Sequence, residues 1–241
     1  MTRNIRNLVI LTGAGISAES GVPTFRADDG LWMGHRIEDV ATPDAFARDP
    51  ALVQDFYNRR RRQLSEVRPN AAHLALADLA ARWDGDILLV TQNVDDLHDR
   101  VHAETPPAPG FDLVHMHGEL LKVRCTRTGR VCDWPGDLAA HEPSPHHGEG
   151  RLRPHIVWFG EFPLEMDRID GALAACDLFV AIGTSGAVWP AAGFVRQAGF
   201  AGAHTVEINL EPTPGSRLFD EGLYGPATET VPAFVEGLLA D

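Results

Sequence analysis

An apolar segment that runs directly into a glycine-rich turn places the strongest constraint on the fold of this 241-residue chain. Residues 8–12 read LVILT, and residues 13–21 continue as GAGISAESG. An apolar run before such a turn is typical of a buried strand that leads into the start of a helix. Gly13 and Gly15 permit a tight turn and a close approach of the backbone to a neighbouring segment. The chain is therefore expected to contain a strand–turn–helix unit with its turn at one edge of a sheet.

The spacing of small residues in this turn predicts a phosphate-binding site. Ala18 occupies the position at which the G-x-G-x-x-G/A fingerprint places a small residue, so that helix and strand can pack. The free N–H groups at the start of such a helix suit a pyrophosphate. No second strand with an acidic residue follows after about 20 residues, as the pattern of nicotinamide-dependent dehydrogenases requires. Instead, a loop follows that carries Phe25 and Arg26 beside the expected phosphate site.

Three further apolar segments also run into a cluster of small or polar residues. Residues 87–91, 177–182 and 204–208 each run into small or polar residues, with helical patterns between them. The four clusters in chain order are Gly13-Ala14-Gly15, Gln92-Asn93-Val94-Asp95, Gly183-Thr184-Ser185 and Asn209-Leu210-Glu211. This alternation of strands and helices predicts an α/β fold with a doubly wound parallel sheet. Ligands of such sheets bind at the carboxyl ends of the strands, which is where these clusters are expected.

Composition argues against several classes of function. The formal net charge of −13 disfavours binding to nucleic acid or to an anionic membrane surface, because both attract positive proteins. No apolar run approaches the roughly 18 residues of a membrane span, and residues 1–7 lack the apolar region of a secretory signal. The three cysteines form no even disulfide framework, so a reducing, cytoplasmic setting is expected.

Two stretches depart from the alternation of strands and helices. Residues 35–69 contain helical patterns, and residues 123–155 look irregular and are rich in Cys, Pro, His and Gly. The arginines at 59–62 form the only basic cluster, and a run of charges on a helix is ordinarily a solvated face. Tyr57 and Arg60 are three residues apart, so they occupy neighbouring positions on one helix and could point together.

Taken in order, these clusters resemble the motifs of the sirtuins, the NAD-dependent protein-lysine deacylases. The matching motifs are Gly13-Ala14-Gly15-Ile16-Ser17, Thr24-Phe25-Arg26, Thr91-Gln92-Asn93-Val94-Asp95, His117-Gly118, Gly183-Thr184-Ser185 and Asn209-Leu210-Glu211. They span residues 8–211, and within the family the chain is most similar to the short bacterial type.

The resemblance implies a division into two domains. Residues 1–34, 70–122 and 156–241 would form a Rossmann-like NAD-binding domain. The small domain would consist of two insertions, a helical one at residues 35–69 and a zinc-ribbon-like one at residues 123–155.

The resemblance also implies that NAD is a co-substrate, and it assigns cofactor-binding roles to positions in the clusters. The pyrophosphate and its neighbouring ribose would contact Gly13, Ala14, Gly15, Ser17 and Ala18. The nicotinamide ribose and carboxamide would contact Phe25, Arg26, Trp32, Gln92, Asn93 and Asp95. The adenosine half would contact Gly183, Thr184, Ser185, Asn209, Leu210, Glu211 and Ala227. Backbone N–H groups at the anionic centre of NAD and polar side chains at its riboses are chemically consistent with this division.

His117 would be the catalytic base. In the family reaction, the acyl oxygen of a modified lysine attacks the nicotinamide-ribose carbon and expels nicotinamide. The histidine then accepts a proton from a ribose hydroxyl, for which its ordinary pKa is suited. The products are free lysine, nicotinamide and O-acyl-ADP-ribose. His115 is the local rival, because strand alternation would send both side chains to the same face, and only the following Gly118 and the family pattern favour His117.

Ala41, Tyr57 and Arg60 match the acyl pocket of the sirtuins that remove succinyl and malonyl groups. In that subclass an alanine leaves room in the pocket, and a Tyr-x-x-Arg pair binds the distal carboxylate of the acyl group. A guanidinium can grip a carboxylate through two hydrogen bonds, and a phenol adds one more. The resemblance thus predicts a desuccinylase or demalonylase that retains deacetylase activity.

The expected structural zinc site of the family is incomplete. Cys125 fits the first of the four family cysteines, but Thr128 stands where its C-x-x-C partner should be. Cys132, His141, His146 and His147 could build a mixed site with Cys125, although their spacing fits no tight zinc pattern. We expect no metal, so that packing alone would hold residues 123–155.

Three other functions are compatible with parts of the pattern. A dehydrogenase is disfavoured by the missing acidic residue and by the Phe25-Arg26 loop. A catalytically silent NAD-binding module is disfavoured because both Asn93 and His117 are present. Mono-ADP-ribosyl transfer would use the same site and stays open. The expected partners are acylated lysine side chains of proteins, and a monomer is the default because no exposed apolar helix stands out.

Overall fold

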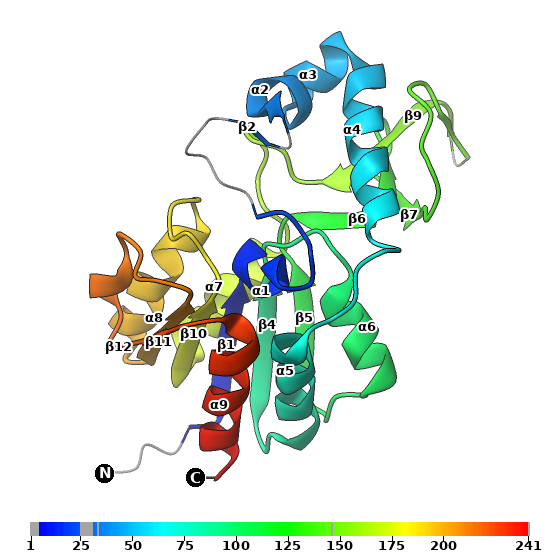
Figure 1. Ribbon diagram of the computed structural model, residues 1–241. Coiled ribbons are helices and arrows are strands. Elements are labelled where there is room, and N and C mark those ends of the chain that lie inside the picture. Colours follow the sequence, from blue (N-terminus) through cyan, green and yellow to red (C-terminus); the bar gives the residue numbers. More distant parts are fainter. Residues whose placement is uncertain (1–4, 25–30, 33, 146, 241) are drawn as a thin grey trace.

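The computed structural model describes residues 5–24, 31–32, 34–145 and 147–240, but not the side chains of 31–32 and 147–149. The chain forms a large α/β domain and a small domain, which lies beyond the carboxyl ends of the main strands (Figure 1). The predicted positions Phe25 and Arg26 lie outside the described residues, and only the backbone of Trp32 is described.

Within the described residues, six parallel strands form the main sheet in the order β12-β11-β10-β1-β4-β5. Their bounds are Asn7–Thr12 (β1), Asp86–Thr91 (β4), Phe111–His115 (β5), Leu178–Ile182 (β10), His204–Asn209 (β11) and Glu221–Tyr224 (β12). The chain adds β4 and β5 on one side of β1 and then returns to add β10 to β12 on the other. The order therefore reverses between β1 and β10, where such sheets bind their ligands. This topology confirms the predicted doubly wound α/β fold.

Helices cover both faces of this sheet, which explains why its central strands are continuously apolar. On β1, Leu8 and Ile10 belong to the core beneath one helical layer, whereas Val9 and Leu11 belong to the core beneath the other. The first layer consists of α1 (Ala14–Ala18), α5 (Ala71–Arg82) and α9 (Ala227–Ala240). The second consists of α7 (Met166–Ala175) and α8 (Phe194–Ala201). Helix α6 (Leu97–Glu104) packs beside α5, and two short 3-10 turns lie at Ala191–Gly193 and Ser216–Leu218.

The small domain combines short helices with a second sheet. Its helices are α2 (Ile37–Val40), α3 (Pro43–Arg48) and α4 (Pro50–Gln63), preceded by the two-stranded pair β2 (Leu31–Trp32) and β3 (His35–Arg36). The caps of α3 and α4 are side-chain oxygens that accept backbone N–H bonds, at Thr42 from Ala45 and at Asp49 from Leu52. Proline at the first helical position completes both starts.

The expectation that residues 123–155 are irregular was wrong. They form most of a four-stranded antiparallel sheet in the order β7-β6-β9-β8, with bounds Val131–Asp133 (β7), Gly118–Cys125 (β6), His147–Ile156 (β9) and Pro143–Ser144 (β8). Its buried apolar side chains are few: Val123, Cys125, Leu138 and Leu152 form one small cluster, and Leu120 and Ile156 join the cluster shared with α2 to α4. Because so few apolar side chains are needed there, the strands carry no clear alternating pattern, and pairing between distant segments creates the sheet.

The arginine run at residues 59–62 is not a uniformly solvated face. Arg59 and Arg62 are exposed and pair with carboxylates, whereas Arg60 and Arg61 are buried. Arg61 donates from Nε to the Leu120 carbonyl at 2.8 Å, so it ties α4 to β6. Helix α4 is therefore buried on the side that faces the small sheet, and only Arg59 and Arg62 of its basic run meet water.

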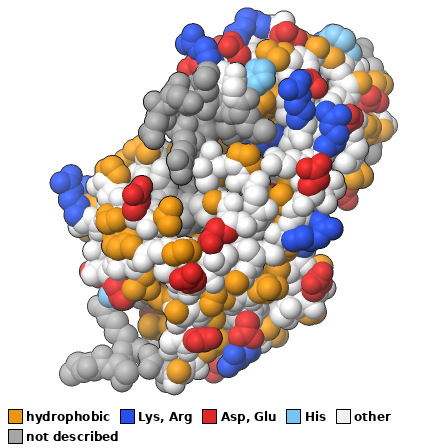
Figure 2. Space-filling model, in the orientation of Figure 1, with side chains coloured by type: hydrophobic (Ala, Val, Ile, Leu, Met, Phe, Trp, Pro, Cys, Tyr) orange, Lys and Arg blue, Asp and Glu red, His pale blue; other side chains and the backbone are white. Residues whose placement is uncertain are grey.

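The surface carries no membrane-spanning element among the described residues, since no helix there is both long and apolar enough to cross a bilayer. On the face shown in Figure 2, most Lys and Arg side chains lie over the small domain, whereas acidic side chains are spread over both domains.

Candidate active site

Three glycines bring the ends of β1 and β10 into direct backbone contact. The Gly13 and Gly15 amides donate to the carbonyls of Ile182 and Gly183 at 3.0 and 2.9 Å. A Cβ on Gly15 would lie 2.6 Å from the Gly183 Cα, and Gly183 itself has φ +62°. These two amides are therefore not the free donors that the sequence led us to expect. Ala18 is exposed, so the close packing assigned to it is made by Gly15 instead.

A buried polar network joins α1 to the loop after β4. The Asn93 side-chain amide donates to the Gly13 carbonyl at 3.1 Å and to the Ser17 hydroxyl at 3.2 Å. The Ser17 hydroxyl in turn donates to Asp95 at 3.1 Å. Burial raises the pKa of Asp95, although hydrogen bonds from the Leu97 amide and Ser17 partly oppose this. Four predicted site residues from two distant motifs, Gly13, Ser17, Asn93 and Asp95, thus form one connected group.

Two buried histidines lie behind this network. His73 completes a capping box at the start of α5 with Asn70 and lies 3.4 Å from the Ser17 hydroxyl. His98, which sequence reasoning missed, lies 3.1 Å from the Thr12 hydroxyl and packs against the His73 ring. Burial lowers the pKa of His73 to about 4 and lowers that of His98 well below the ordinary value. Both rings are therefore neutral at neutral pH.

His117 follows the end of β5 and is held by a backbone carbonyl. Its Nδ1 lies 3.1 Å from the Gln92 carbonyl oxygen, which can only accept, so the proton resides on Nδ1 and Nε2 keeps its lone pair. Burial lowers the pKa of His117, although this hydrogen bond partly opposes the effect. A neutral imidazole with a fixed tautomer is the form that a general base requires.

Gly118 makes the turn after His117 possible. It has φ +82°, and a Cβ there would lie 1.9 Å from the His155 carbonyl oxygen. Only glycine combines this left-handed conformation with such a close backbone approach. The chain consequently leaves the β5 direction at this turn and enters β6.

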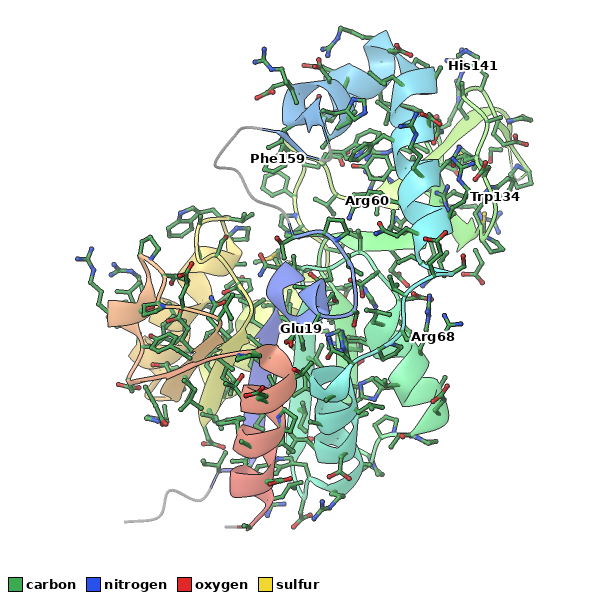
Figure 3. The ribbon with its side chains drawn as sticks, in the orientation of Figure 1. Glu19, Arg60, Arg68, Trp134, His141 and Phe159 are labelled. Atoms are coloured by element: carbon green, nitrogen blue, oxygen red, sulfur yellow. The ribbon has the colours of Figure 1, made fainter. Side chains whose placement is uncertain are left out.

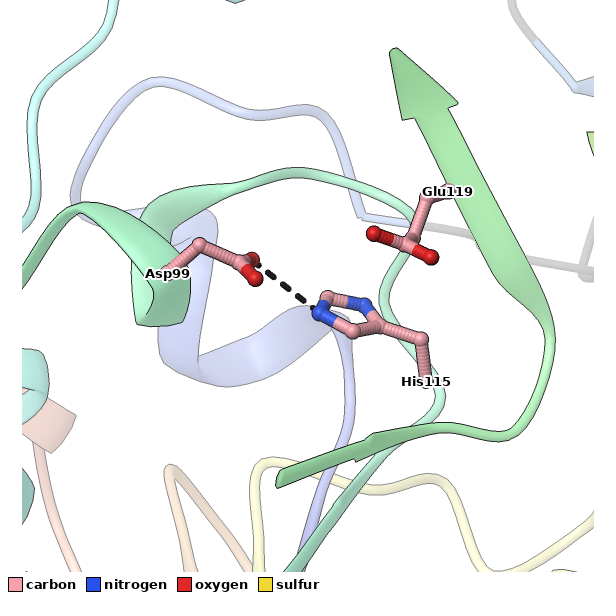
Figure 4. Close-up of side chains that lie close together, drawn as sticks. All are labelled: Asp99, His115 and Glu119. Atoms are coloured by element: carbon pink, nitrogen blue, oxygen red, sulfur yellow. Dashed lines mark ion pairs between the residues drawn. The ribbon is translucent and has the colours of Figure 1, made fainter. Parts of the chain in front are cut away.

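His115 is the last residue of β5, so the expected strand alternation does not extend from it to His117. Its Nε2 lies 3.0 Å from Asp99, with Glu119 on the other side of the ring (Figure 4). Burial alone would lower the pKa of His115, but the carboxylates of Asp99 and Glu119 outweigh it and raise the pKa. Among the described residues, this trio is the one group of three side chains close enough to share a metal ion. The Lys122 amine, 2.8 Å from Glu119, already supplies positive charge there.

The residues expected at the adenosine half lie along the ends of β10 and β11. Asn209 donates from its side chain to the Thr184 carbonyl at 2.8 Å, which links the two clusters. Thr184 and Gln92 line one shallow hollow, so the residues that follow β10 and β4 lie close together beside the end of β1. Leu210 and Glu211 are exposed, Ser185 accepts a bond from the Ala187 amide, and Ala227 is the first residue of α9.

Glu207 anchors the loop that follows β11, a role the sequence did not reveal. It is 2% exposed and accepts hydrogen bonds from the hydroxyls of Thr213, Ser216 and Tyr224. Three donors satisfy a carboxylate that would otherwise be costly to bury. Glu207 therefore anchors the loop after Asn209 to strand β11.

Tyr57 and Arg60 are both buried in α4. The Tyr57 hydroxyl accepts a hydrogen bond from Trp158 Nε1 at 2.9 Å, and burial raises its pKa to about 12. Arg60 is 9% exposed, and burial lowers its pKa to about 10, against the attraction of Tyr57 and Asp95. Figure 3 shows Arg60 and Phe159 on the opposite side of α4 from Trp134. Ala41 is buried nearby, and its carbonyl accepts a bond from the Phe159 amide at 3.0 Å.

The cysteines do not fit a four-thiolate zinc site. Cys176 lies in the core of the large domain, which leaves Cys125 and Cys132 in the small sheet. The hydrogen-bonding neighbours of the Cys125 thiol are the hydroxyls of Ser144 and Thr128 rather than further thiols. Within the described part of residues 123–155, neither cysteine belongs to a group of three potential metal ligands.

A parallel sheet with this strand order and a close glycine contact at its switch point is the plan of a dinucleotide-binding α/β protein. The family model described as "Sir2 family" matches residues 13–190. The chain therefore belongs to the Sir2 family, the sirtuins.

Relatives and solved structures agree with this assignment. The chain is 56% identical over 242 residues to the NAD-dependent protein deacylase of Pasteurella multocida, covering 99% of this chain and 100% of that protein. It is 57% identical over 241 residues to the enzyme of the same name from Escherichia coli strain K12, covering 96% and 82%. A crystal structure of a Sir2 homologue with NAD superposes with a TM-score of 0.86 at 37% identity, covering 98% and 90%. The chain is thus an NAD-dependent deacylase of the sirtuin kind, with NAD as its co-substrate.

Proposed function

We propose that this sirtuin removes succinyl and malonyl groups from protein lysines, with acetyl groups as further substrates. The main observation in support of this proposal is that Tyr57 and Arg60 are both buried on α4. The acyl group would be transferred to ADP-ribose with release of nicotinamide and free lysine, and one water molecule would be consumed. The fold, the position of His117 and the family membership support this reaction.

The NAD would lie across the strand ends, with its pyrophosphate at the switch point between β1 and β10. The contact of Gly13, Gly15 and Gly183 supports this placement, because it leaves the strand ends free of side chains where a phosphate must approach backbone. The network of Ser17, Asn93 and Asp95 would then face the nicotinamide ribose.

The other predicted contacts are proposed in the same arrangement. Adenosine would contact the residues after β10 and β11 together with the start of α9, namely Gly183, Thr184, Ser185, Asn209, Leu210, Glu211 and Ala227. Ala14, Ala18 and Gln92 would complete the contacts near the pyrophosphate and the nicotinamide, together with Phe25, Arg26 and Trp32.

His117 would act as the base that accepts the ribose hydroxyl proton at Nε2. The Gln92 carbonyl supports this assignment because it holds the ring with Nδ1 protonated. His115 is disfavoured as the base, since its ring is engaged with Asp99.

The charge of Arg60 supports a carboxylate-bearing acyl group. A buried guanidinium is stabilised when an anion binds beside it, and it can bind a carboxylate through two parallel hydrogen bonds. The phenol of Tyr57 stays protonated at working pH and can donate a third bond. An acetyl group offers no carboxylate to either side chain, so its removal would depend less on the pair.

The test compares Arg60→Met with Arg59→Met on succinyl-, malonyl- and acetyl-lysine peptides. Charge-assisted hydrogen bonds lead us to expect a loss of about 10- to 100-fold in kcat/KM for succinyl and malonyl peptides in Arg60→Met, with a much smaller loss for acetyl peptide. Arg59 is the matched control because it is exposed and pairs with Asp55 on the solvent side. Equal losses on all three peptides would contradict the carboxylate clamp, our name for Tyr57 and Arg60 as the pair that binds the distal carboxylate. The inactive reference is His117→Ala.

We further propose that the enzyme acts in the cytoplasm as a monomer. The three cysteines are free rather than paired, which suits a reducing compartment. Size-exclusion chromatography with light scattering would test the monomer against the expected 26.2 kDa.

A further inference from the structure

Trp158 connects the proposed carboxylate clamp of Tyr57 and Arg60 to an ion-pair network in the small domain. It follows β9, is 2% exposed and donates its indole N–H to the Tyr57 hydroxyl at 2.9 Å. The two rings lie with their centroids 6.3 Å apart, and Phe46 packs on the same indole. Neither the apolar pattern nor any motif in the sequence pointed to this contact.

Charged side chains hold the indole in place. The Arg153 guanidinium carbon lies 3.3 Å from the centre of the Trp158 ring, and Arg153 binds both carboxylate oxygens of Glu161 at 2.7 and 2.9 Å. The same carboxylate accepts the Trp158 backbone N–H at 2.9 Å and an ion pair from Arg124 at 2.8 Å. Glu161 therefore orients the indole twice, through its backbone and through the stacked arginine.

This arrangement restricts the phenol proton of Tyr57. A phenol oxygen has one proton to donate, and at neutral pH the Tyr57 phenol keeps it, since its ordinary pKa of about 10 is already high and burial raises the pKa further, to about 12. The indole N–H occupies one acceptor direction of the oxygen, so the phenol proton must point away from Trp158. Accepting a hydrogen bond also strengthens the one that the phenol donates, since hydrogen bonds in a chain polarise one another.

We propose that Trp158 is a positioning residue for acyl selectivity, which aims the Tyr57 hydroxyl at the acyl carboxylate and is itself held by Arg153 and Glu161. The inference rests on the proposed function, because it concerns the same clamp. It adds that selectivity depends on a side chain that does not touch the carboxylate. Acetyl peptides, which carry no distal carboxylate, are the internal reference.

The first experiment replaces Trp158 by phenylalanine, which keeps an aromatic ring and removes the N–H. We expect the ratio of kcat/KM for succinyl peptide to that for acetyl peptide to fall about five-fold, the scale of one neutral hydrogen bond. The control is Trp134→Phe, because Trp134 also donates its indole N–H, to the Asp137 carbonyl at 3.0 Å, but lies on the far side of α4 (Figure 3). An unchanged ratio in folded Trp158→Phe would overturn the inference.

The second experiment asks whether Trp158 acts through the phenol. In a Tyr57→Phe background the hydroxyl is gone, so Trp158→Phe should lower the ratio no further. Independent, additive losses would mean that Trp158 acts by packing alone and would overturn the inference. If Trp158→Phe fails to fold, Glu161→Gln loosens the same indole without altering it, and the ratio should fall in that variant too.

These outcomes separate the two proposals. If Arg60→Met and Tyr57→Phe both leave the succinyl-to-acetyl ratio unchanged, the carboxylate clamp is wrong and the role of Trp158 is wrong with it. If those variants lower the ratio while Trp158→Phe and Glu161→Gln do not, the clamp stands and only the positioning role fails.

Discussion

The Nδ1 atom of His117 lies 3.1 Å from the backbone carbonyl oxygen of Gln92, which places the end of β5 against the end of β4. The contact decides the tautomer of the imidazole, because a carbonyl oxygen can accept a hydrogen bond but cannot donate one. It also joins two motifs that are 25 residues apart in the chain. The resulting neutral ring has its lone pair on Nε2, where it can accept a proton.

The pH profile of the reaction should report the lowered pKa of His117. Since the base must be unprotonated, kcat/KM should rise with pH through a value below the ordinary histidine pKa of about 6.5 and stay level above it. The measurement is kcat/KM for an acyl peptide at saturating NAD between pH 5 and 8. A midpoint above 7 would contradict the assignment. The matched control is His115→Gln, whose profile of kcat/KM against pH should keep the acidic midpoint of the wild type.

Replacing Gly118 by alanine should destabilise the protein more than the same change at Gly129. Both glycines have positive φ, but a Cβ at Gly118 would lie 1.9 Å from the His155 carbonyl oxygen, whereas nothing lies within 4 Å at Gly129. Gly129→Ala should cost about 1 kcal/mol of unfolding free energy, and Gly118→Ala more than about 3 kcal/mol. Urea unfolding of both variants measures the difference. Equal costs would mean that the backbone approach at the turn is not as close as described.

Acid should destabilise the protein partly through His73. The unfolded chain takes up a proton near pH 6.5 but the folded state only near pH 4, so this contribution to stability is complete above 6.5 and is lost as pH falls toward 4. The full effect is about 3 kcal/mol. His73→Gln keeps a capping-box side chain without the titration. Its unfolding free energy should fall less between pH 7 and 4.5 than that of the wild type.

The control for His73→Gln is the same substitution at His141, an exposed residue of the small domain. It should leave the dependence of stability on pH as in the wild type. If His73→Gln also follows the wild-type curve, the buried neutral histidine does not contribute to acid sensitivity.

Much of the large domain could be predicted from the chain alone. Runs such as residues 8–11 and 178–182 are apolar at every position because both faces of a parallel sheet are covered, and that signal is local. The polar clusters after these strands could likewise be placed at one sheet edge. Strand β12, by contrast, is largely exposed and carries no continuous apolar run, so no local signal marked it.

The small sheet and the side-chain arrangement were decided only by tertiary structure. Arg59 and Arg60 are identical neighbours, yet one meets water and the other is buried, because the rest of the fold covers only one side of α4. His115 and His117 are two residues apart, yet the end of β5 between them sends one toward Asp99 and the other toward the Gln92 carbonyl.

The sequence by itself determined the α/β alternation, the order of the motifs and the membership of the chain in the sirtuin family, because these depend on residue type and spacing along the chain. The folded structure alone decided which of these residues touch. Ser17 meets Asp95, and Trp158 meets Tyr57 across 101 positions of the chain. Such contacts arise from long-range packing, for which no local pattern exists, and the proposed selectivity depends on them.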